Sequence, residues 1–332
     1  MHARHAMILG TGKYLPQRRV TAAEMDQMLH VKDGWVLKKS DVHTRYFIKD
    51  ETASEMGAKA AYAALEAAGL TFADIDCIVC TSGTMEQPIP CTAALIQRAM
   101  GQQQSGVPAF DINSTCLSFV AALDVMSYLI DAGRYRRILL VSTEIASIGL
   151  NWSHKESAAL FGDGAAAVVI GRSGEGSPSR IVHAAMQTFS EGAEMSEIRG
   201  GGTKQHPREH RADNADDYLF SMDGSAIFKL AARKLPQFVD EMMKAAGTSM
   251  SEIKLVIPHQ GSAMAMRLIQ KKLAIRDEQM MYITPDHGNT IAASIPMGLH
   301  EAIRLQKINR GDRVLLLGTS AGVSLGGVIF DY

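Results

Sequence analysis

The chain has 332 residues, of which 46% are hydrophobic and 21% are charged, and its formal net charge is −1 at pH 7. This composition is typical of a globular protein with a sizeable core, and the near-neutral charge excludes a general attraction to nucleic acid or to anionic membranes. The N-terminus lacks the long apolar core of a signal peptide, and no apolar run approaches the length of a membrane span. We therefore expect a soluble, cytoplasmic protein.

The N-terminal segment is predicted to contain a strand at residues 6–10 and then a glycine-containing turn at residues 10–12. Leu15 stands where a dinucleotide-binding fingerprint requires its third glycine, and no strongly helical stretch follows directly, so nucleotide binding is rejected here. Farther along, Thr52 and Glu55 have the spacing of a capping box, which predicts the start of an alanine-rich helix.

The chain has only four cysteines, two of which, Cys77 and Cys80, have the spacing of a redox or metal-binding pair. Both lie within a predicted strand, where residues three apart point to opposite faces, so they are poor partners for one ion or one disulfide. We predict a structural role for both, and the sparse cysteine content fits the reducing cytosol.

Another cysteine, Cys116, lies in a polar turn between two predicted elements. An apolar run at residues 107–110 precedes this turn, and a helical run at residues 120–132 follows it. Free backbone N–H groups and the positive end of the helix dipole favour a thiolate there, and the thiolate is the nucleophilic form of cysteine. The alternative is a small buried apolar residue, which is the usual fate of a free cysteine.

One long irregular stretch, residues 200–217, is rich in glycine and charged residues. Its two histidines, His206 and His210, suggest a metal site, but Pro207 argues against a helix that would present both. We predict a solvated surface loop.

The sequence contains two internal matches in the same order. Residues 67–80 align without a gap on residues 245–258, and residues 131–141 match residues 309–317, with the two members of each pair starting 178 residues apart. Chance resemblance between helix-to-strand turns is the alternative, but the ordered pair of matches favours a duplicated α/β unit.

The duplication predicts two halves, residues 1–172 and residues 173–332, with Cys116 in the first. Each half contains a nearly continuous apolar strand, at residues 138–141 and at residues 314–317. Such strands are typical of parallel sheets that are covered on both faces.

The second half also places polar residues at predicted strand ends. His259 lies just past the strand at residues 255–258, where sheet proteins gather reactive groups. Asn289 lies in a glycine turn before a helix of small residues, and the last strand ends in the small-residue turn 318–322, whose backbone N–H groups could face an oxyanion. With Cys116, these residues place a thiol, an imidazole, a carboxamide and an N–H donor at strand ends of two equivalent halves.

From end to end, the chain resembles the β-ketoacyl-acyl-carrier-protein synthase III enzymes of the thiolase superfamily. The resemblance implies an α/β fold of two duplicated halves stacked in five layers (αβαβα), a homodimer, and a Cys-His-Asn site of Cys116, His259 and Asn289 where the halves meet. The motifs that carry it are residues 110–116, Phe161-Gly162-Asp163-Gly164-Ala165, Pro258-His259-Gln260, His287-Gly288-Asn289-Thr290 with Ala292-Ala293-Ser294, and the glycine-rich C-terminus.

The resemblance also implies a reaction of fatty acid biosynthesis. Cys116 would accept an acyl group from an acyl-CoA or acyl carrier protein, while the backbone N–H groups of Cys116 and Ala321 stabilise the oxyanion. Malonyl-ACP or another malonyl thioester would then lose CO₂, and His259 and Asn289 would hold the enolate that attacks the acyl group and gives a 3-oxoacyl product. No metal or redox cofactor is implied.

The same resemblance suggests substrate-binding positions. Trp35 matches the tryptophan that stacks on the adenine of CoA, whereas Lys39 and Lys155 stand where bacterial enzymes usually carry arginine. Lysine keeps the charge but loses the planar, stacking fork, so the grip on CoA is expected to be weaker. Three further positions are candidates for contact with the pantetheine arm or the acyl chain: Ser225, Phe228 and Ser262.

A basic patch is a candidate docking surface, because acyl carrier proteins are acidic. A solvated helix face explains three of its four members, all but Lys229, equally well. The patch consists of Lys229, Arg267, Lys271 and Lys272.

Several positions depart from the family pattern. Leu117-Ser118 replaces the small pair that usually follows the cysteine, residues 319–322 replace a glycine run, and Ile89 stands where a phenylalanine from the partner subunit often closes the acyl tunnel. These departures predict a specialised paralogue with a non-acetyl primer. Ile89 also argues against the olefin-pathway enzymes, which place a glutamate there.

Related enzyme classes are distinguished by their site residues. A thiolase needs a second reactive cysteine after Cys116, elongating ketoacyl synthases use two histidines, and the papain-like cysteine signature is absent. Condensing enzymes that start quinolones, alkylresorcinols or polyketides stay open as alternatives, as do acyltransferases to oxygen or nitrogen on the same fold. A non-catalytic acyl-thioester-binding subunit is a further alternative, against which the presence of all three site residues speaks.

Overall fold

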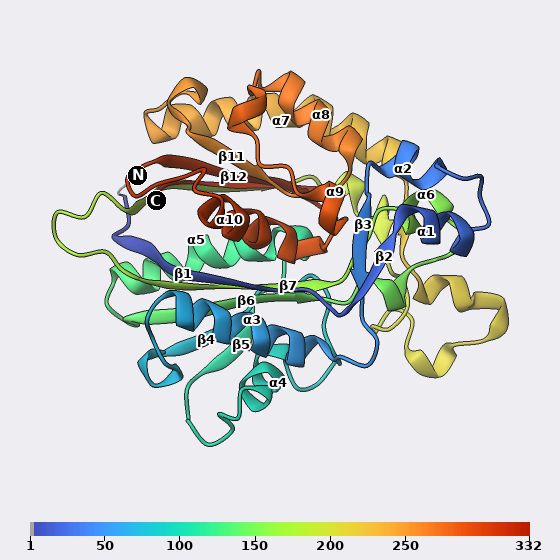
Figure 1. Cartoon of the computed structure of the whole chain (residues 1–332), viewed down its shortest axis with the longest axis horizontal. Helices are drawn as coiled ribbons and strands as arrows, with labels where there is room; N and C mark the ends of the chain where they lie inside the picture. The colour runs from blue at the N-terminus through green and yellow to red at the C-terminus, as the bar shows by residue number, and fades with distance from the viewer. Residues whose placement is uncertain (1–2) are drawn as a thin grey trace.

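The protein, a computed structural model that describes residues 3–332, contains two main β-sheets, one from each half of the chain (Figure 1). The strand order is β1-β7-β6-β4-β5 in the first sheet and β11-β12-β13-β8 in the second. These strands are β1 (Ala6–Tyr14), β4 (Cys77–Cys80), β5 (Ala109–Asp111), β6 (Arg137–Glu144), β7 (Gly164–Arg172), β8 (Arg180–Thr188), β11 (Leu255–Pro258), β12 (Arg313–Ser320) and β13 (Ser324–Asp331).

The two sheets have the same connectivity. In the first, β4 is parallel to β6, β6 is antiparallel to β7, and β7 is antiparallel to β1. In the second, β11, β12, β13 and β8 repeat this pattern, so the predicted duplication is confirmed. The sheets are mixed where parallel sheets were expected, because each half adds two antiparallel strands beside its parallel pair. The boundary after Arg172 stays a prediction.

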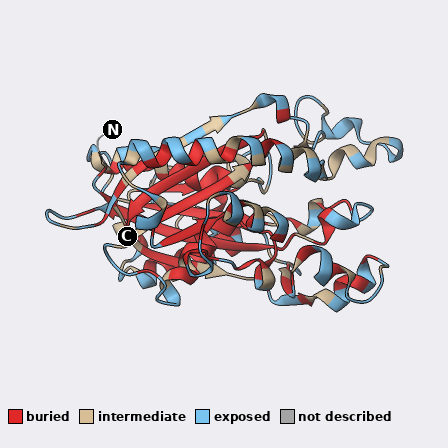
Figure 2. Ribbon diagram, turned by 90° about the horizontal axis from the view of Figure 1, so that it is seen from above, coloured by how far each residue is buried: buried red, intermediate tan, exposed pale blue. Residues whose placement is uncertain are grey.

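Helices and sheets alternate in five layers, as predicted (Figure 1). Helices α5 and α10 lie between the sheets and share one apolar cluster with both of them. Other helices cover the outer faces, and Figure 2 shows most of the sheet strands buried beneath them, whereas the edge strands β5 and β8 are partly exposed. The helices are α3 (Ala53–Ala67) and α4 (Thr92–Ala99) below the first sheet, α5 (Ser118–Asp131) and α10 (Ser294–Arg304) in the middle, and α7 (Gly224–Ala246) and α8 (Ala263–Lys272) above the second.

A smaller region covers the end of the layers at the right of Figure 1. Its core is a separate apolar cluster that includes Phe47 and packs against Trp35. The segment 200–217 follows the surface with two short 3₁₀ helices, and its mostly exposed residues confirm the predicted surface loop. The elements of this region are β2 (Arg18–Thr21), α1 (Ala22–Met28), α2 (Trp35–Ser40), β3 (Thr44–Phe47), α6 (Lys155–Ala158), β9 (Ser196–Glu197) and β10 (Ser221–Met222).

Two local predictions are confirmed. The Thr52 side chain caps α3 with the reciprocal bond from Glu55, and the helix stops before Gly69, which has a left-handed φ of +64°. The pair in β4 also behaves as expected, because Cys77 packs into the central cluster and Cys80 into the cluster on the outer face of the sheet.

The predicted turn at residues 10–12 is wrong, because β1 continues through it to Tyr14. A Cβ at Gly10 would lie 2.5 Å from the Ala64 oxygen, and one at Gly12 would lie 2.2 Å from the Ala60 oxygen. The two glycines therefore allow the backbone of α3 to lie directly on the strand.

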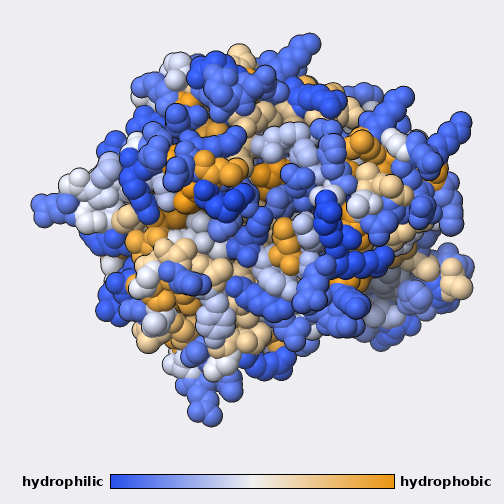
Figure 3. Space-filling view, in the orientation of Figure 1, coloured by the Kyte–Doolittle hydropathy of each residue, from blue (hydrophilic) through white to orange (hydrophobic). Residues whose placement is uncertain are grey.

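The outer surface is mixed in character. On the face drawn in Figure 3, hydrophobic residues form small groups that hydrophilic residues separate. Among residues 3–332, no helix combines the length and the apolar character that are needed to cross a membrane.

Candidate active site

The turn that carries Cys116 connects β5 to α5 in a strained conformation. Cys116 lies in a short 3₁₀ helix, and α5 begins only at Ser118. Thr115 has a φ of +50°, which is unusual for a β-branched residue and recurs at functional sites. The Asn113 carboxamide oxygen accepts a bond of 2.8 Å from the Thr115 N–H and supports this conformation.

A buried hydroxyl in the first half holds this turn from below. Ser118 Oγ accepts a bond of 2.9 Å from the Ser114 N–H. The same oxygen lies 2.7 Å from the carbonyl oxygen of Thr115 and 3.0 Å from that of Ser82, either of which can accept its proton. Ser118 thus ties the turn to the end of β4.

A second hydroxyl reaches the turn from the other half of the chain. Ser320, the last residue of β12, accepts a bond of 3.1 Å from the Cys116 N–H and donates one of 2.8 Å to the Ser114 carbonyl. The next backbone N–H, that of Ala321, is near enough to the Cys116 sulfur to lower the pKa of the thiol. The two N–H groups predicted for the oxyanion hole therefore lie at the same sulfur.

The prediction of a resting thiolate at Cys116 is wrong. Desolvation raises the pKa of the thiol to about 12, and the nearby charge of Glu144 raises it further, against the lowering effect of the N–H groups of Cys116 and Ala321. Burial outweighs the helix-terminal effect because an ion loses its hydration there. Cys116 is a neutral thiol that must lose its proton during the reaction.

Glu144 is a buried carboxyl beside the nucleophile, and the sequence analysis did not select it. It ends β6, accepts bonds from the backbone N–H groups of Gly83 and Thr84, and lies 2.6 Å from the Thr84 hydroxyl. Burial raises the pKa of Glu144 to about 7. An acidic residue at the end of a strand with an apolar centre, residues 138–141, was the signal in the sequence.

His259 lies just past β11 and is held as a neutral donor. Its Nδ1 lies 2.7 Å from Ser294 Oγ, which also accepts a bond from the Gln260 N–H. Burial lowers the pKa of His259 to about 4, and a bond to the backbone of Ile291 raises it. With Ser294 Oγ donating to Nδ1, the opposite ring nitrogen, Nε2, carries the hydrogen of the neutral ring, and this is the tautomer that a donor to substrate requires.

Asn289 is fixed between α9 (Thr284–His287) and the 3₁₀ turn that follows. Its backbone pairs with residues 160–162, through bonds of 2.8 Å to the Leu160 oxygen and 3.1 Å from the Gly162 N–H. The side-chain oxygen accepts a bond of 2.9 Å from the Ile291 N–H, and Nδ2 donates one of 3.3 Å to the Gly261 carbonyl. These bonds orient the carboxamide with its N–H₂ group on the His259 side.

The three predicted residues share close neighbours at the carboxyl ends of the strands. A Cβ at Gly318 would lie 3.0 Å from both the His259 side chain and that of Leu117, which follows the nucleophile. A Cβ at Gly261, whose carbonyl accepts from Asn289, would lie 3.5 Å from His259 Nε2. The fold thus brings the segments that carry the thiol, the imidazole and the carboxamide close together from both halves.

Three predicted CoA-binding residues lie together on α2 and α6. The Lys39 ammonium lies 5.9 Å from the centre of the Trp35 ring and 2.8 Å from Glu156 Oε1. Lys155, beside that glutamate, donates a bond of 3.4 Å to the His30 carbonyl. A phosphate would therefore compete with Glu156 for Lys39.

Other candidate substrate contacts lie on α7, α8 and the loop after β4. Ser225 and Phe228 are in the first turns of α7, while the Ser262 hydroxyl caps α8 by accepting a bond of 3.1 Å from the Ala265 N–H. Ile89 lies in the loop after β4, and 84% of its surface is exposed.

The four residues of the predicted basic patch are all exposed, on helices α7 and α8, which contact each other. Within residues 3–332, none of the four forms an ion pair. They are Lys229 on α7 and Arg267, Lys271 and Lys272 on α8.

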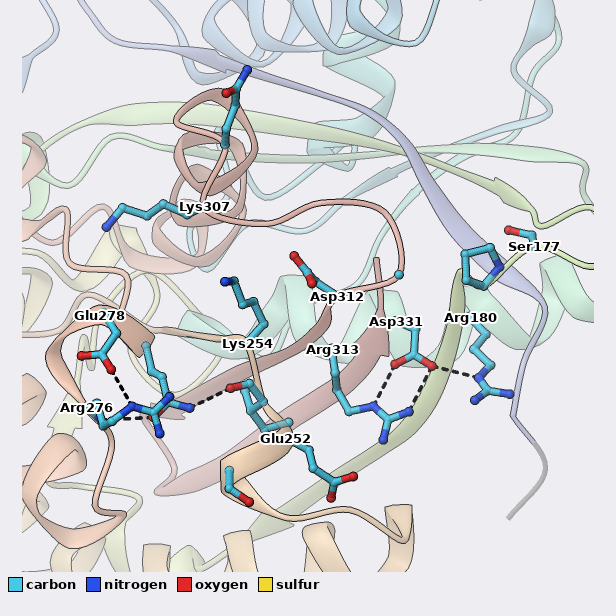
Figure 4. Close-up of a pocket in the computed structure, with 16 residues that line it drawn as sticks. Ser177, Arg180, Glu252, Lys254, Arg276, Glu278, Lys307, Asp312, Arg313 and Asp331 are labelled. Carbon is cyan, nitrogen blue, oxygen red and sulfur yellow. Dashed lines mark hydrogen bonds and ion pairs between the residues drawn. The ribbon is translucent and has the colours of Figure 1, made fainter.

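A polar pocket of about 970 Å³ lies away from these residues, at the amino end of β12 (Figure 4). Most of its charges are already paired. Asp331 accepts bonds from Arg180 at 3.0 Å and Arg313 at 2.8 Å, and Arg276 pairs with Glu278. None of the predicted site residues lines this pocket.

Comparisons with known proteins agree with the geometry. Family models described as 3-oxoacyl-[acyl-carrier-protein (ACP)] synthase III and its C-terminal part match residues 110–190 and 243–332. The chain is similar to beta-ketoacyl-[acyl-carrier-protein] synthase III of Aquifex aeolicus, with 33% identity over 325 residues, 98% of this chain and 99% of that protein. It is 32% identical over 333 residues to the enzyme of the same name from Neisseria meningitidis serogroup B, covering 99% of each. The crystal structure of 3-oxoacyl-[acyl-carrier-protein] synthase III from Aquifex aeolicus VF5 has a TM-score of 0.88 and 32% identity, covering 98% of this chain and 100% of that one.

Proposed function

The chain belongs to the 3-oxoacyl-[acyl-carrier-protein] synthase III family, and on that premise we propose that it condenses an acyl group carried on Cys116 with a malonyl thioester. Members of this family are acyltransferases that form carbon–carbon bonds, and the chain is one of them. The observation that carries the proposal is the pair of uncharged donors beside the half-buried thiol, the imidazole of His259 and Nδ2 of Asn289.

In the first step, Cys116 attacks the thioester carbonyl carbon of an acyl group that is carried on CoA or on acyl carrier protein. The sulfur–carbon bond to Cys116 forms, the bond to the CoA sulfur breaks, and the thiol proton ends on the released CoA thiol. The N–H group of Ala321, which is near the sulfur, stabilises the tetrahedral oxyanion. The N–H of Cys116 joins it by sharing the hydrogen that it donates to Ser320 Oγ in the resting protein. The bonds and protons exchanged belong to the thioester substrates and to Cys116, so we propose that no metal or redox cofactor takes part.

In the second step, a malonyl thioester places its thioester carbonyl against His259 and Asn289. Loss of CO₂ leaves an electron pair on the neighbouring carbon, and the two donors stabilise the enolate. That carbon attacks the acyl carbon, the bond to Cys116 breaks, and the released sulfur takes a proton from solvent. A carboxylate partner for His259 would favour imidazolium, whereas Ser294 leaves the ring neutral.

We also propose a primer other than acetyl and a homodimer as the working unit. The exposure of Ile89 supports the homodimer, because a second copy of the chain would cover this apolar side chain. The proposed primer is supported by Ile89 standing where the resemblance places a phenylalanine that closes the acyl tunnel. The unpaired cations on α7 and α8 support an acidic acyl carrier protein as the malonyl donor.

Intact-mass spectrometry with a panel of acyl-CoAs of graded chain length tests this function. We expect one acyl adduct on the protein with a medium or long chain, release of the adduct on adding a malonyl thioester, and no adduct on Cys116→Ala. Acetyl-CoA as the best donor would refute the non-acetyl primer. No adduct with any chain length would refute the condensing function and favour a binding subunit.

A further inference from the structure

Ser320 is a buried hydroxyl that joins the two halves of the chain at the nucleophile. Only 5% of its surface is exposed, and its single oxygen accepts from the Cys116 N–H at 3.1 Å while it donates to the Ser114 carbonyl at 2.8 Å. The two partners lie more than 200 positions away in the sequence and on opposite sides of the Thr115 backbone. One side chain thus bridges both ends of the turn.

This bridge departs from the pattern that the chain otherwise resembles. The family carries a glycine run where this chain has residues 319–322, and a glycine cannot supply a hydroxyl. The small pair that usually follows the cysteine is likewise replaced, and the replacement Ser118 is the other hydroxyl that binds the turn. The two departures therefore meet on the same backbone segment, one from each half.

The turn needs a restraint from outside because its own conformation is unfavourable. A left-handed, β-branched residue such as Thr115 persists only where the surroundings over-determine it. The N–H groups at the sulfur come from different halves, Cys116 from the turn and Ala321 from the end of β12. The distance between them depends on the hydrogen bonds that join residues 114–116 to residues 320–321. Ser320 makes these bonds through its side chain.

We propose that Ser320 is a positioning residue for the nucleophile, which holds the Cys116 sulfur beside the N–H of Ala321 by hydrogen-bonding both ends of the turn to the end of β12. The inference rests on the proposed function for its effect on acylation, but its effect on the thiol itself does not depend on that function. By fastening the turn, the hydroxyl keeps the sulfur beside the Ala321 N–H, which lowers the pKa of Cys116, so its loss is expected to leave less thiolate at any given pH.

The first test compares Ser320→Ala with the parent protein in single-turnover acylation by the best acyl-CoA of the panel. We expect the acylation rate to fall by about 10- to 100-fold, the scale of a misaligned catalytic group, with little change in the acyl-CoA concentration at half-maximal rate. Ser179→Ala is the matched control. Its hydroxyl is also buried and bonds the Tyr332 carbonyl at 2.7 Å, but it lies roughly 20 Å away along the sheet.

The second test measures alkylation of Cys116 by iodoacetamide between about pH 7 and pH 9, where the rate follows the thiolate fraction. We expect slower alkylation of Ser320→Ala at every pH and an unchanged rate for Ser179→Ala. Equal alkylation and equal acylation in Ser320→Ala and the parent would overturn the proposal. If the parent is never acylated, the proposed function fails, and the alkylation result still decides the role of Ser320.

A pair of variants of equal shape covers the case in which Ser320→Ala does not fold. Ser320→Thr keeps the hydroxyl and Ser320→Val replaces it with a methyl group. Faster acylation and alkylation of the threonine variant support the proposal, and equal rates for the pair contradict it.

Discussion

The neutral state of His259 depends on a neighbour that has no acid–base role of its own. Ser294 Oγ accepts from the Gln260 N–H and lies 2.7 Å from Nδ1 of the ring, to which it can donate its own proton. Burial then keeps the ring uncharged by lowering its pKa to about 4. The second half-reaction forms its enolate by loss of CO₂, so no general base has to remove a proton. An uncharged hydrogen-bond donor that stabilises the enolate is what this step requires.

The two half-reactions separate the roles of Cys116 and Asn289. Asn289→Ala removes a donor to the malonyl carbonyl and leaves the N–H groups at the sulfur in place. We expect acylation within about threefold of the parent and condensation slower by about 100-fold, the scale of a lost oxyanion donor. Intact mass reports acylation, and release of CO₂ from a labelled malonyl thioester reports condensation.

The result that would remove Asn289 from its role is an equal loss of both half-reactions. His259→Ala serves as the companion variant and is expected to follow the same split. Cys116→Ala is the opposite control, since it abolishes the acyl adduct.

At this scale, residue types at strand ends were readable from the sequence, but their environment was not. Cys116, His259 and Asn289 each follow a strand or turn that local patterns identify. The raised pKa of the thiol and the contacts of Ser320 come from packing between segments about 200 residues apart. A single-sequence pattern contains no information on such distant contacts.

Among the elements, the contact between β1 and α3 shows why a glycine pair was misinterpreted. A Gly-x-Gly pattern after an apolar strand has two common causes. The chain turns there, or the strand continues and another backbone lies very close to it. Here the second cause applies, because α3 lies against the strand with only 2.2 Å between the Ala60 oxygen and a Cβ placed on Gly12. The α3 start was predicted correctly because its capping box is complete within four residues.

Gly12→Ala tests this contact. The added Cβ has backbone atoms as neighbours, so the helix must move, and we expect a loss of about 2 kcal/mol or more in the free energy of unfolding. Urea denaturation followed by circular dichroism measures it. Gly174→Ala is the control, since a Cβ there has no atom within 4 Å, and a change below about 0.5 kcal/mol is expected. A loss of similar size in both variants would mean that the close contact does not explain the glycine.

The whole molecule depends on how two similar halves dock, and a charged cluster lies at their interface. Lys13 of β1 lies 2.6 Å from Glu301 of α10 and 3.0 Å from Nε2 of His287. The His287 Nδ1 lies 3.1 Å from the Ile283 carbonyl, which can only accept, so Nδ1 carries the hydrogen and Nε2 accepts from Lys13. The duplication was predictable from internal matches, but the docking was not, because these contacts join residues more than 270 positions apart.

The same cluster gives stability a pH dependence. Burial, with the charge of Lys13, lowers the pKa of His287 from 6.5 to about 4. Between these two values the unfolded chain binds the proton more strongly, so protonation favours unfolding and stability falls as the pH is lowered. Glu144 acts in the opposite direction, because its pKa is raised to about 7 and the folded state gains protons first. Only a comparison between parent and variant therefore isolates His287.

His287→Gln keeps an acceptor for Lys13 and removes the titration. Between about pH 7.5 and pH 5 we expect the parent to lose about 2 kcal/mol more unfolding free energy than the variant, because roughly 1.5 pH units of the histidine range are crossed at about 1.4 kcal/mol each. Urea denaturation at both pH values measures the difference, and His206→Gln, which removes an exposed histidine, should leave the parent's slope unchanged. Identical pH slopes for His287→Gln and the parent would show that His287 is not kept neutral at the interface, and that the docking of the halves does not depend on its protonation.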